Sequence, residues 1–344
     1  MSLSREYTQE ELEELENKST QFHEALSGKD LNEQSIENLT DILCVTTNEE
    51  RQLIRSYFKK SYNHPIQNDI KERFTGDLSL LQEIMINMFD TPYEYDAREL
   101  RKALSDSLGD EDDTIIEIFS SRPKDHLNTV DLAYSKFYDT SLKDELKSQL
   151  PKQFAEFLLL LMDSDRPDEQ TLSGDEAYEI AQEIIKNGTK LYASDAELFK
   201  KVFVEKSRID LILVSRAYYE LTEKCLYEAF EEENVVAKSI FNDEEEEKKV
   251  RNKNIKLIKA LIFTVITPAE FFAKKLITAL KEFTTDINTL IRILITRREI
   301  DMDAINEYYT KETNSDLKND VENESTCMNY PYIGKIMLNL LNVE

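Results

Sequence analysis

Apolar residues recur every three or four positions along most of the chain, which is the spacing of amphipathic α-helices. Between Ala97 and Leu161 this spacing predicts five short helices, with Asp, Ser and Pro residues between them as caps and turns. The predicted helices span residues 97–104, 112–121, 124–136, 142–150 and 153–161. Helices of this length cannot bury an apolar face alone, so they are expected to form a compact bundle that stacks against its neighbours.

The most apolar stretch of the chain runs from Ile255 to Leu280. Lysines at positions 256, 259, 274 and 275 interrupt it, and so does Pro268. A membrane-spanning helix needs about 20 mostly apolar residues in a row, so two buried amphipathic helices are predicted here and no membrane span. The N-terminus lacks the apolar region that is typical of a signal peptide.

A long-range repeat is visible in the same pattern. Three helix-period segments end in a basic residue, and an aromatic residue follows twelve positions later. The basic residues are Arg122, Lys206 and Arg297, and the aromatic residues are Tyr134, Tyr218 and Tyr309. The same offset from Thr46 reaches Phe58. Four matching offsets predict four repeats of several short helices each, and such repeats stack on one another.

The repeats and the segments outside them have predicted boundaries. These are 1–18 for an acidic N-terminal segment, 19–90 and 91–162 for repeats 1 and 2, 163–174 for a linker, and 175–266 and 267–344 for repeats 3 and 4. The linker thus separates two pairs of repeats along the sequence.

Charge and cysteine content narrow the class of protein. The 344 residues include 43 Lys and Arg against 69 Asp and Glu, and the net charge of -26 excludes general DNA or RNA binding because it repels a phosphate backbone. Three cysteines, at positions 44, 225 and 327, are widely separated, so a reducing, cytoplasmic setting is expected. The histidines at 23, 64 and 126 form no zinc motif, and no phosphate-binding loop occurs, so no enzyme activity is predicted.

Two loops in each repeat carry the candidate chemistry: one before the second helix and one after the fourth. The first loop spans residues 105–110, 189–194 and 280–285 in repeats 2, 3 and 4. Forty residues after Gly109, Ala193 and Thr284 stand Gln149, Glu233 and Glu324. Two of these three residues are carboxylates at the same place in their repeats.

Two segments resemble the start of an annexin repeat. They are Tyr95-Asp96-Ala97 followed by residues 100–104, and Leu290 to Arg297 followed by Glu299-Ile300-Asp301. The resemblance covers about residue 20 to the C-terminus. It implies an all-α fold of four repeats with about five helices each, in which right-handed superhelical bundles form a curved disc. Losses of glycine and acidic residues are similar to divergent protist members such as the alpha-giardins.

The resemblance also implies calcium sites. In annexins, three loop carbonyls and the distant carboxylate bind Ca2+, whose open positions take lipid phosphate oxygens. The matching residues here are Leu280, Glu282, Thr284 and Glu324 in repeat 4, Thr189, Leu191, Ala193 and Glu233 in repeat 3, and Ser105, Ser107, Gly109 and Gln149 in repeat 2. In repeat 1 the loop is 27–30 and the distant position holds a cation, Arg73, so this repeat is expected not to bind calcium unless the adjacent Glu72 takes the position.

Two further sets of residues follow from the alignment of the repeats. Leu108, Tyr192 and Phe283 share one loop-tip position, where apolar and aromatic side chains can enter the headgroup region, although single exposed apolar residues are also common. Asp96, Glu117, Arg122 and Arg292 match positions that line the polar central channel of annexins. A buried ion-pair network is the preferred interpretation of this polar core, ahead of a calcium-gated channel.

Together these features predict calcium-dependent binding to acidic phospholipid membranes. Calcium would bridge an acidic protein and an acidic leaflet, which otherwise repel each other. The expected location is cytoplasmic and peripheral, at the inner membrane face or the cytoskeleton. The alternative is an annexin-fold structural protein, associated with a cytoskeletal partner, whose calcium binding is reduced or lost.

Overall fold

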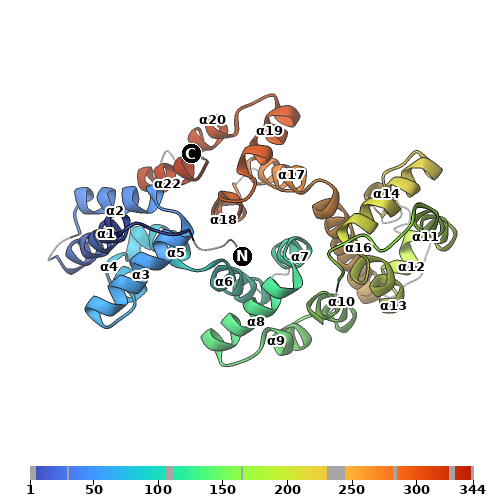
Figure 1. Cartoon of the computed structure of the whole chain (residues 1–344), viewed down its shortest axis with the longest axis horizontal. Helices are drawn as coiled ribbons and strands as arrows, with labels where there is room; N and C mark the ends of the chain where they lie inside the picture. The colour runs from blue at the N-terminus through green and yellow to red at the C-terminus, as the bar shows by residue number, and fades with distance from the viewer. Residues whose placement is uncertain are drawn as a thin grey trace. The chain divides into compact units, whose positions relative to one another are not determined.

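The computed structural model describes residues 5–28, 31–105, 112–163, 166–230, 245–281, 285–324 and 330–341. These residues form helices, turns and loops and contain no strand, which confirms the predicted all-α fold (Figure 1). The chain divides into two compact units. The first unit comprises residues 1–95 and 272–344, and the second comprises residues 96–271. The first unit therefore contains both the beginning and the end of the chain. The predicted linker, residues 163–174, lies inside the second unit and does not separate the two units.

The first unit contains the helices of both ends of the chain. They are α1 (Gln9–Ser27), α2 (Glu33–Val45), α3 (Asn48–Tyr62), α4 (Ile66–Arg73), the 3-10 turn η1 (Gly76–Leu78), α5 (Ser79–Phe89), α18 (Ile287–Arg297), α19 (Met302–Thr313), α20 (Leu317–Glu322) and α22 (Pro331–Leu341). Within this unit α1 packs against α3, and α22 packs against α2.

The second unit contains the middle of the chain. Its helices are α7 (Asp112–Ser121), α8 (Lys124–Tyr138), α9 (Leu142–Gln149), α10 (Lys152–Asp163), α11 (Gly174–Asn187), α12 (Thr189–Tyr192), α13 (Ala196–Phe199), the π-turn η2 (Lys200–Val204), α14 (Arg208–Thr222) and α16 (Glu245–Ile266). Here α11 packs against α14, and α16 packs against α7 (Figure 1). The division between the units falls inside α6 (Pro92–Ser105) and α17 (Pro268–Lys281).

The ends of the helices follow the capping residues in the sequence. Thr8, Thr47, Ser173 and Ser207 each form a capping box with the acidic residue three positions later, which satisfies two backbone groups at the helix start. The predicted helix 112–121 has these bounds in the structure, and its four neighbours differ only at their ends.

A backbone feature repeats once in each predicted repeat. Four non-glycine residues among those described have positive φ: Asn63, Asp139, Glu223 and Asn314. Each follows the last residue of a helix, α3, α8, α14 or α19, and closes it in the left-handed conformation. Each also stands five positions after the aromatic residue of the repeat pattern, and all four aromatic rings are buried. The repeat in the sequence and the repeat in the backbone conformation therefore have the same positions along the chain.

The apolar stretch near residue 268 forms two helices as predicted. Helix α16 ends at Ile266 and α17 begins at Pro268, because proline lacks the N–H that a helix interior requires. Leu257, Ile258 and Leu261 on α16 are buried. No helix within the described ranges has the length and apolar content needed to span a membrane.

The predicted linker is held firmly where the structure describes it. Residues 166–173 contain no helix, but the carboxylate of Asp210 on α14 accepts hydrogen bonds from the backbone N–H groups of Thr171 and Leu172, both at 2.9 Å. The Thr171 hydroxyl donates a third bond at 2.8 Å. Burial alone would raise the pKa of Asp210, but these donors outweigh it and lower the pKa to about 2.

Candidate calcium and membrane sites

Repeat 4 brings its predicted carboxylate to its predicted loop. The hydroxyl of Thr285, in the loop between α17 and α18, donates a 2.7 Å hydrogen bond to Oε1 of Glu324. The two residues are 39 positions apart, and Glu324 is only 7% exposed. Leu280, another predicted ligand, lies in the last turn of α17 at the start of the same loop. Carboxylate, hydroxyl and carbonyl oxygens are the ligands that Ca2+ prefers, so the residues present here fit a calcium site.

Repeat 3 has a differently arranged loop. Gly188, with a φ of 76°, ends α11, and the chain then forms the short helical turn α12. The carbonyl of Thr189 accepts from the N–H of Ala193 at 3.4 Å, and that of Leu191 accepts from Ser194 at 3.0 Å. The carbonyl of Ala193 accepts a 2.8 Å bond from the side chain of Asn254 on α16.

All three predicted carbonyl ligands of repeat 3 therefore accept hydrogen bonds from within the protein. Two of them accept these bonds within the turn of α12, and the third accepts its bond from α16, so calcium binding by this loop stays a prediction. The loop does approach the chain before the predicted carboxylate, since the hydroxyl of Thr189 lies 3.5 Å from the carbonyl of Ala229.

The prediction that Tyr192 contacts the membrane is wrong for this structure. Tyr192 is 0% exposed, and its ring packs edge-on against Phe203 at 6.3 Å between centroids. Burial raises the pKa of Tyr192. The side chain that faces solvent in this turn is the preceding one, Leu191, which is 41% exposed. Adjacent side chains of a helical turn point in different directions, so the exposed apolar residue of this loop is Leu191 and not Tyr192.

Repeat 2 shows less of its predicted site. Ser105, the last residue of α6, donates its hydroxyl back to the carbonyl of Arg101 at 2.7 Å. Gln149, the last residue of α9, is exposed. Other predicted ligands and loop tips lie outside the described residues: Ser107, Leu108 and Gly109 in repeat 2, Glu233 in repeat 3, and Glu282, Phe283 and Thr284 in repeat 4.

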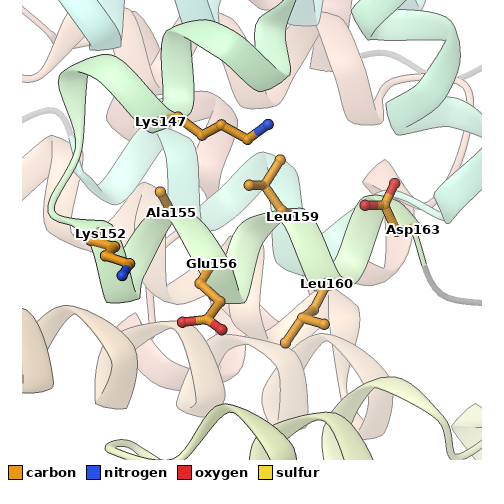
Figure 2. Close-up of a pocket in the computed structure, with 7 residues that line it drawn as sticks. All are labelled: Lys147, Lys152, Ala155, Glu156, Leu159, Leu160 and Asp163. Carbon is orange, nitrogen blue, oxygen red and sulfur yellow. The ribbon is translucent and has the colours of Figure 1, made fainter.

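A surface cavity of about 360 Å³ is lined by residues of α9 and α10. Its apolar lining comes from Ala155, Leu159 and Leu160, and Figure 2 shows Lys147 extending from α9 over Leu159. Lys152, Glu156 and Asp163 complete the lining. The charged groups surround the apolar ones without converging on one point, so the cavity does not form an ion site.

Repeat 1 contains a cation at the position where repeats 3 and 4 have a carboxylate. Nη2 of Arg73, at the end of α4, donates a 2.7 Å hydrogen bond to the carbonyl of Gly28, which follows α1. Glu72, considered as a substitute ligand, is exposed, and no contact of it with the loop is found in the described part of the chain. That repeat 1 does not bind calcium stays a prediction.

The predicted polar core is partly assembled within the second unit. Arg122 donates to Asp96 through Nε at 2.9 Å and through Nη2 at 3.2 Å. Nε2 of His126 lies 2.7 Å from the same carboxylate. No sequence motif predicted this contact. Burial would raise the pKa of Asp96, but Arg122 and His126 together lower it. A buried ion-paired group of this kind supports the structural interpretation of Asp96 and Arg122.

The other two polar-core residues are also buried. Glu117 is 0% exposed in the second unit, and Arg292 is 2% exposed in the first. The hydroxyl of Thr289 accepts a 3.0 Å bond from Arg292. A single core shared by all four residues stays a prediction.

Over the described ranges, no three His, Cys, Asp or Glu side chains come together as a metal cluster. The predicted calcium sites differ from such a cluster, because each combines one carboxylate with backbone oxygens.

Comparison with known proteins identifies the family. The sequence pattern of the family Annexin matches residues 18–82, 95–161 and 271–326, and the chain belongs to this family. It is 27% identical to annexin A1 of Rattus norvegicus over 290 residues, which cover 84% of this chain and 77% of the relative. It is 25% identical to human annexin A13 over 305 residues, 89% of each chain.

Solved structures agree with the fold. The chain resembles annexin III with a TM-score of 0.80 and 22% identity, over 100% of this chain and 97% of the other. It resembles calcium-bound alpha-14 giardin with a TM-score of 0.71 and 14% identity, over 95% and 99%. Annexins in general bind phospholipid in a calcium-dependent manner and are not enzymes.

Proposed function

We propose that this annexin binds acidic phospholipid membranes in the presence of calcium, chiefly through repeat 4. The contact between Thr285 and Glu324 carries the proposal, because it joins the loop and the distant carboxylate that the sequence pairs. Glu324 would hold the ion together with oxygens of the loop that begins at Leu280. Calcium takes 6 to 8 oxygen ligands, so a site with one carboxylate leaves positions for lipid phosphate oxygens.

Charge explains why an ion is needed. The chain has a net charge of -26, and the cytoplasmic leaflet is also negative, so the two surfaces repel each other. Calcium between them removes that repulsion at the point of contact. We place the protein in the cytoplasm, peripheral at the inner membrane face, where calcium concentration would control its attachment.

Co-sedimentation with phosphatidylserine-containing vesicles over a calcium titration, with a chelator control, tests the proposal. Glu324→Gln keeps the size of the side chain and removes its charge, so it should raise the calcium needed for half-maximal binding at least tenfold. Glu322→Gln is the matched control, because this carboxylate is exposed at the end of α20, two residues before Glu324. Equal titration curves for wild type and Glu324→Gln would contradict the assignment to repeat 4.

A second candidate function is a structural role with reduced calcium binding, in association with a cytoskeletal partner. Two observations favour it: Arg73 meets the loop of repeat 1, and the loop of repeat 3 has its carbonyl groups engaged. Wild-type protein that stays in the supernatant even at millimolar calcium would support this function and reject the first.

A further inference from the structure

We propose that Arg73 is a built-in cation that holds the loop of repeat 1 in place of calcium. The inference rests on the proposed function in one respect: it takes the corresponding pair of positions in repeat 4 as a calcium site. In repeat 1 the ion is replaced by a side chain of the protein, so this repeat neither needs calcium nor accepts it.

The geometry of the two repeats shows the correspondence. In repeat 4, Glu324 follows the fourth helix and meets Thr285 in the loop after the first helix. In repeat 1, Arg73 ends the fourth helix, α4, and meets Gly28 after the first helix, α1. The contacts join residues 39 and 45 positions apart, and the sign of the charge is opposite. In repeat 4 the anionic side chain of Glu324 can bind calcium together with the loop. In repeat 1 the cationic side chain of Arg73 donates a hydrogen bond to the loop directly.

The surroundings of Arg73 favour this role over an ordinary ion pair. Its guanidinium is half-buried, and its one hydrogen bond found among the described residues goes to the Gly28 carbonyl. Its Nε is buried with no acceptor in that part of the chain. A carbonyl oxygen is also a ligand that calcium would use, so the guanidinium fills a place that a free ion would otherwise compete for. The C-terminal end of α4 adds a favourable partial negative charge.

Reversing the charge at position 73 should create a calcium site where Arg73 now contacts the loop. Glutamate is two atoms shorter than arginine, so its carboxylate would end short of the Gly28 carbonyl. The remaining gap suits an ion with ligand distances of about 2.3–2.6 Å on each side. Arg73→Gln removes the cation without supplying a carboxylate, and therefore separates the two effects.

The test combines calcium titration calorimetry with thermal unfolding, in chelator and in millimolar calcium. Arg73→Gln should lower the Tm by about 2–4 °C in both conditions and bind no additional ion. Arg73→Glu should lower the Tm in chelator, regain it in calcium and bind one more ion than wild type. Lys71→Glu is the matched control, because it makes the same change in charge on the exposed side of the same helix end and should gain no ion.

Each of several results would overturn the inference. They are an unchanged Tm for Arg73→Gln, identical behaviour of Arg73→Glu and Arg73→Gln, an extra ion in Lys71→Glu, or an Arg73→Glu chain that stays unfolded in calcium. Repeating Arg73→Glu in the Glu324→Gln background separates this inference from the proposed function. If Glu324→Gln has no effect but Arg73→Glu still gains an ion, the repeat 4 assignment fails and the role of Arg73 stands.

Discussion

The side-chain amide of Asn254 donates a 2.8 Å hydrogen bond to the carbonyl of Ala193, and both residues are 0% exposed. Gln153 adds to the same corner, where its amide donates to the carbonyl of Ser194 at 2.7 Å. The loop of repeat 3 is therefore fastened to helices α10 and α16 of its own unit. A predicted calcium ligand serves as a structural acceptor in this arrangement.

Removing this fastening should destabilise the protein and loosen the loop. Asn254→Ala leaves the buried carbonyl of Ala193 without its partner, which typically costs about 1–3 kcal/mol. We expect a lower free energy of unfolding in urea and faster amide hydrogen exchange at residues 189–194. Asn252→Ala, on the same helix and less buried, is the control and should change neither. Normal protection of the loop in Asn254→Ala would show that the hydrogen bond does not hold it.

Adjacent residues of α12 should respond to substitution in opposite ways. Tyr192→Ser empties a buried position and should lower stability by about 3 kcal/mol or more. Leu191→Ser changes an exposed side chain, so stability should stay the same. If the repeat 3 tip enters the headgroup region, Leu191→Ser will weaken vesicle binding at fixed calcium, as Phe283→Ser is predicted to do in repeat 4. Unfolding curves and vesicle co-sedimentation together decide this, and loss of stability in Leu191→Ser would contradict the assignment.

The fold was predictable because its signals are local and repeated. Helix-period apolar positions, capping residues and Pro268 lie where the helices begin and end, and helix 112–121 was predicted with its observed bounds. The aromatic residue of each repeat marks the turn after α3, α8, α14 or α19, since the left-handed residue follows it by five positions in every repeat. Such patterns need no knowledge of distant contacts.

The sites were less predictable because they depend on single backbone turns and long-range contacts. Whether Leu191 or Tyr192 faces solvent depends on how the chain leaves Gly188, whose φ of 76° starts a helical turn. The contact of His126 with Asp96 spans 30 residues and follows no motif. The chemistry of Arg73, in contrast, was visible in the sequence as a cation at a carboxylate position. Only its hydrogen bond to Gly28 required the structure.

Removing both retained carboxylates should test the whole family mechanism in this chain. The double variant Glu233→Gln with Glu324→Gln should lose most calcium-dependent vesicle binding, because repeats 3 and 4 then lack their predicted carboxylate ligands. Circular dichroism and unfolding curves should match wild type if the effect is on the ion alone. Unchanged vesicle pelleting at every calcium concentration would show that neither carboxylate binds the ion that links protein and lipid.

The link between the predicted linker and α14 should be sensitive to acid. Asp210 has a pKa of about 2 in the folded protein, below its ordinary value of 3.8, so its bonds to Thr171, Leu172 and Ser207 favour the charged form. A lowered pKa contributes stability that is complete above the unfolded value and is lost as the pH falls from about 4 to 2. Each unit of difference between the folded and unfolded pKa corresponds to about 1.4 kcal/mol, so near neutral pH Asp210 contributes about 2 kcal/mol to the free energy of unfolding.

Asp210→Asn should therefore lower the free energy of unfolding by about 2 kcal/mol at pH 7 and by progressively less below pH 4. Urea unfolding of wild type and variant between pH 7 and pH 3 measures the difference directly. Asp175→Asn makes the same change in charge at an exposed position in the first turn of α11 and should have little effect. A difference between wild type and Asp210→Asn that stays constant down to pH 3 would mean that the lost hydrogen-bond geometry matters and the ionisation of Asp210 does not.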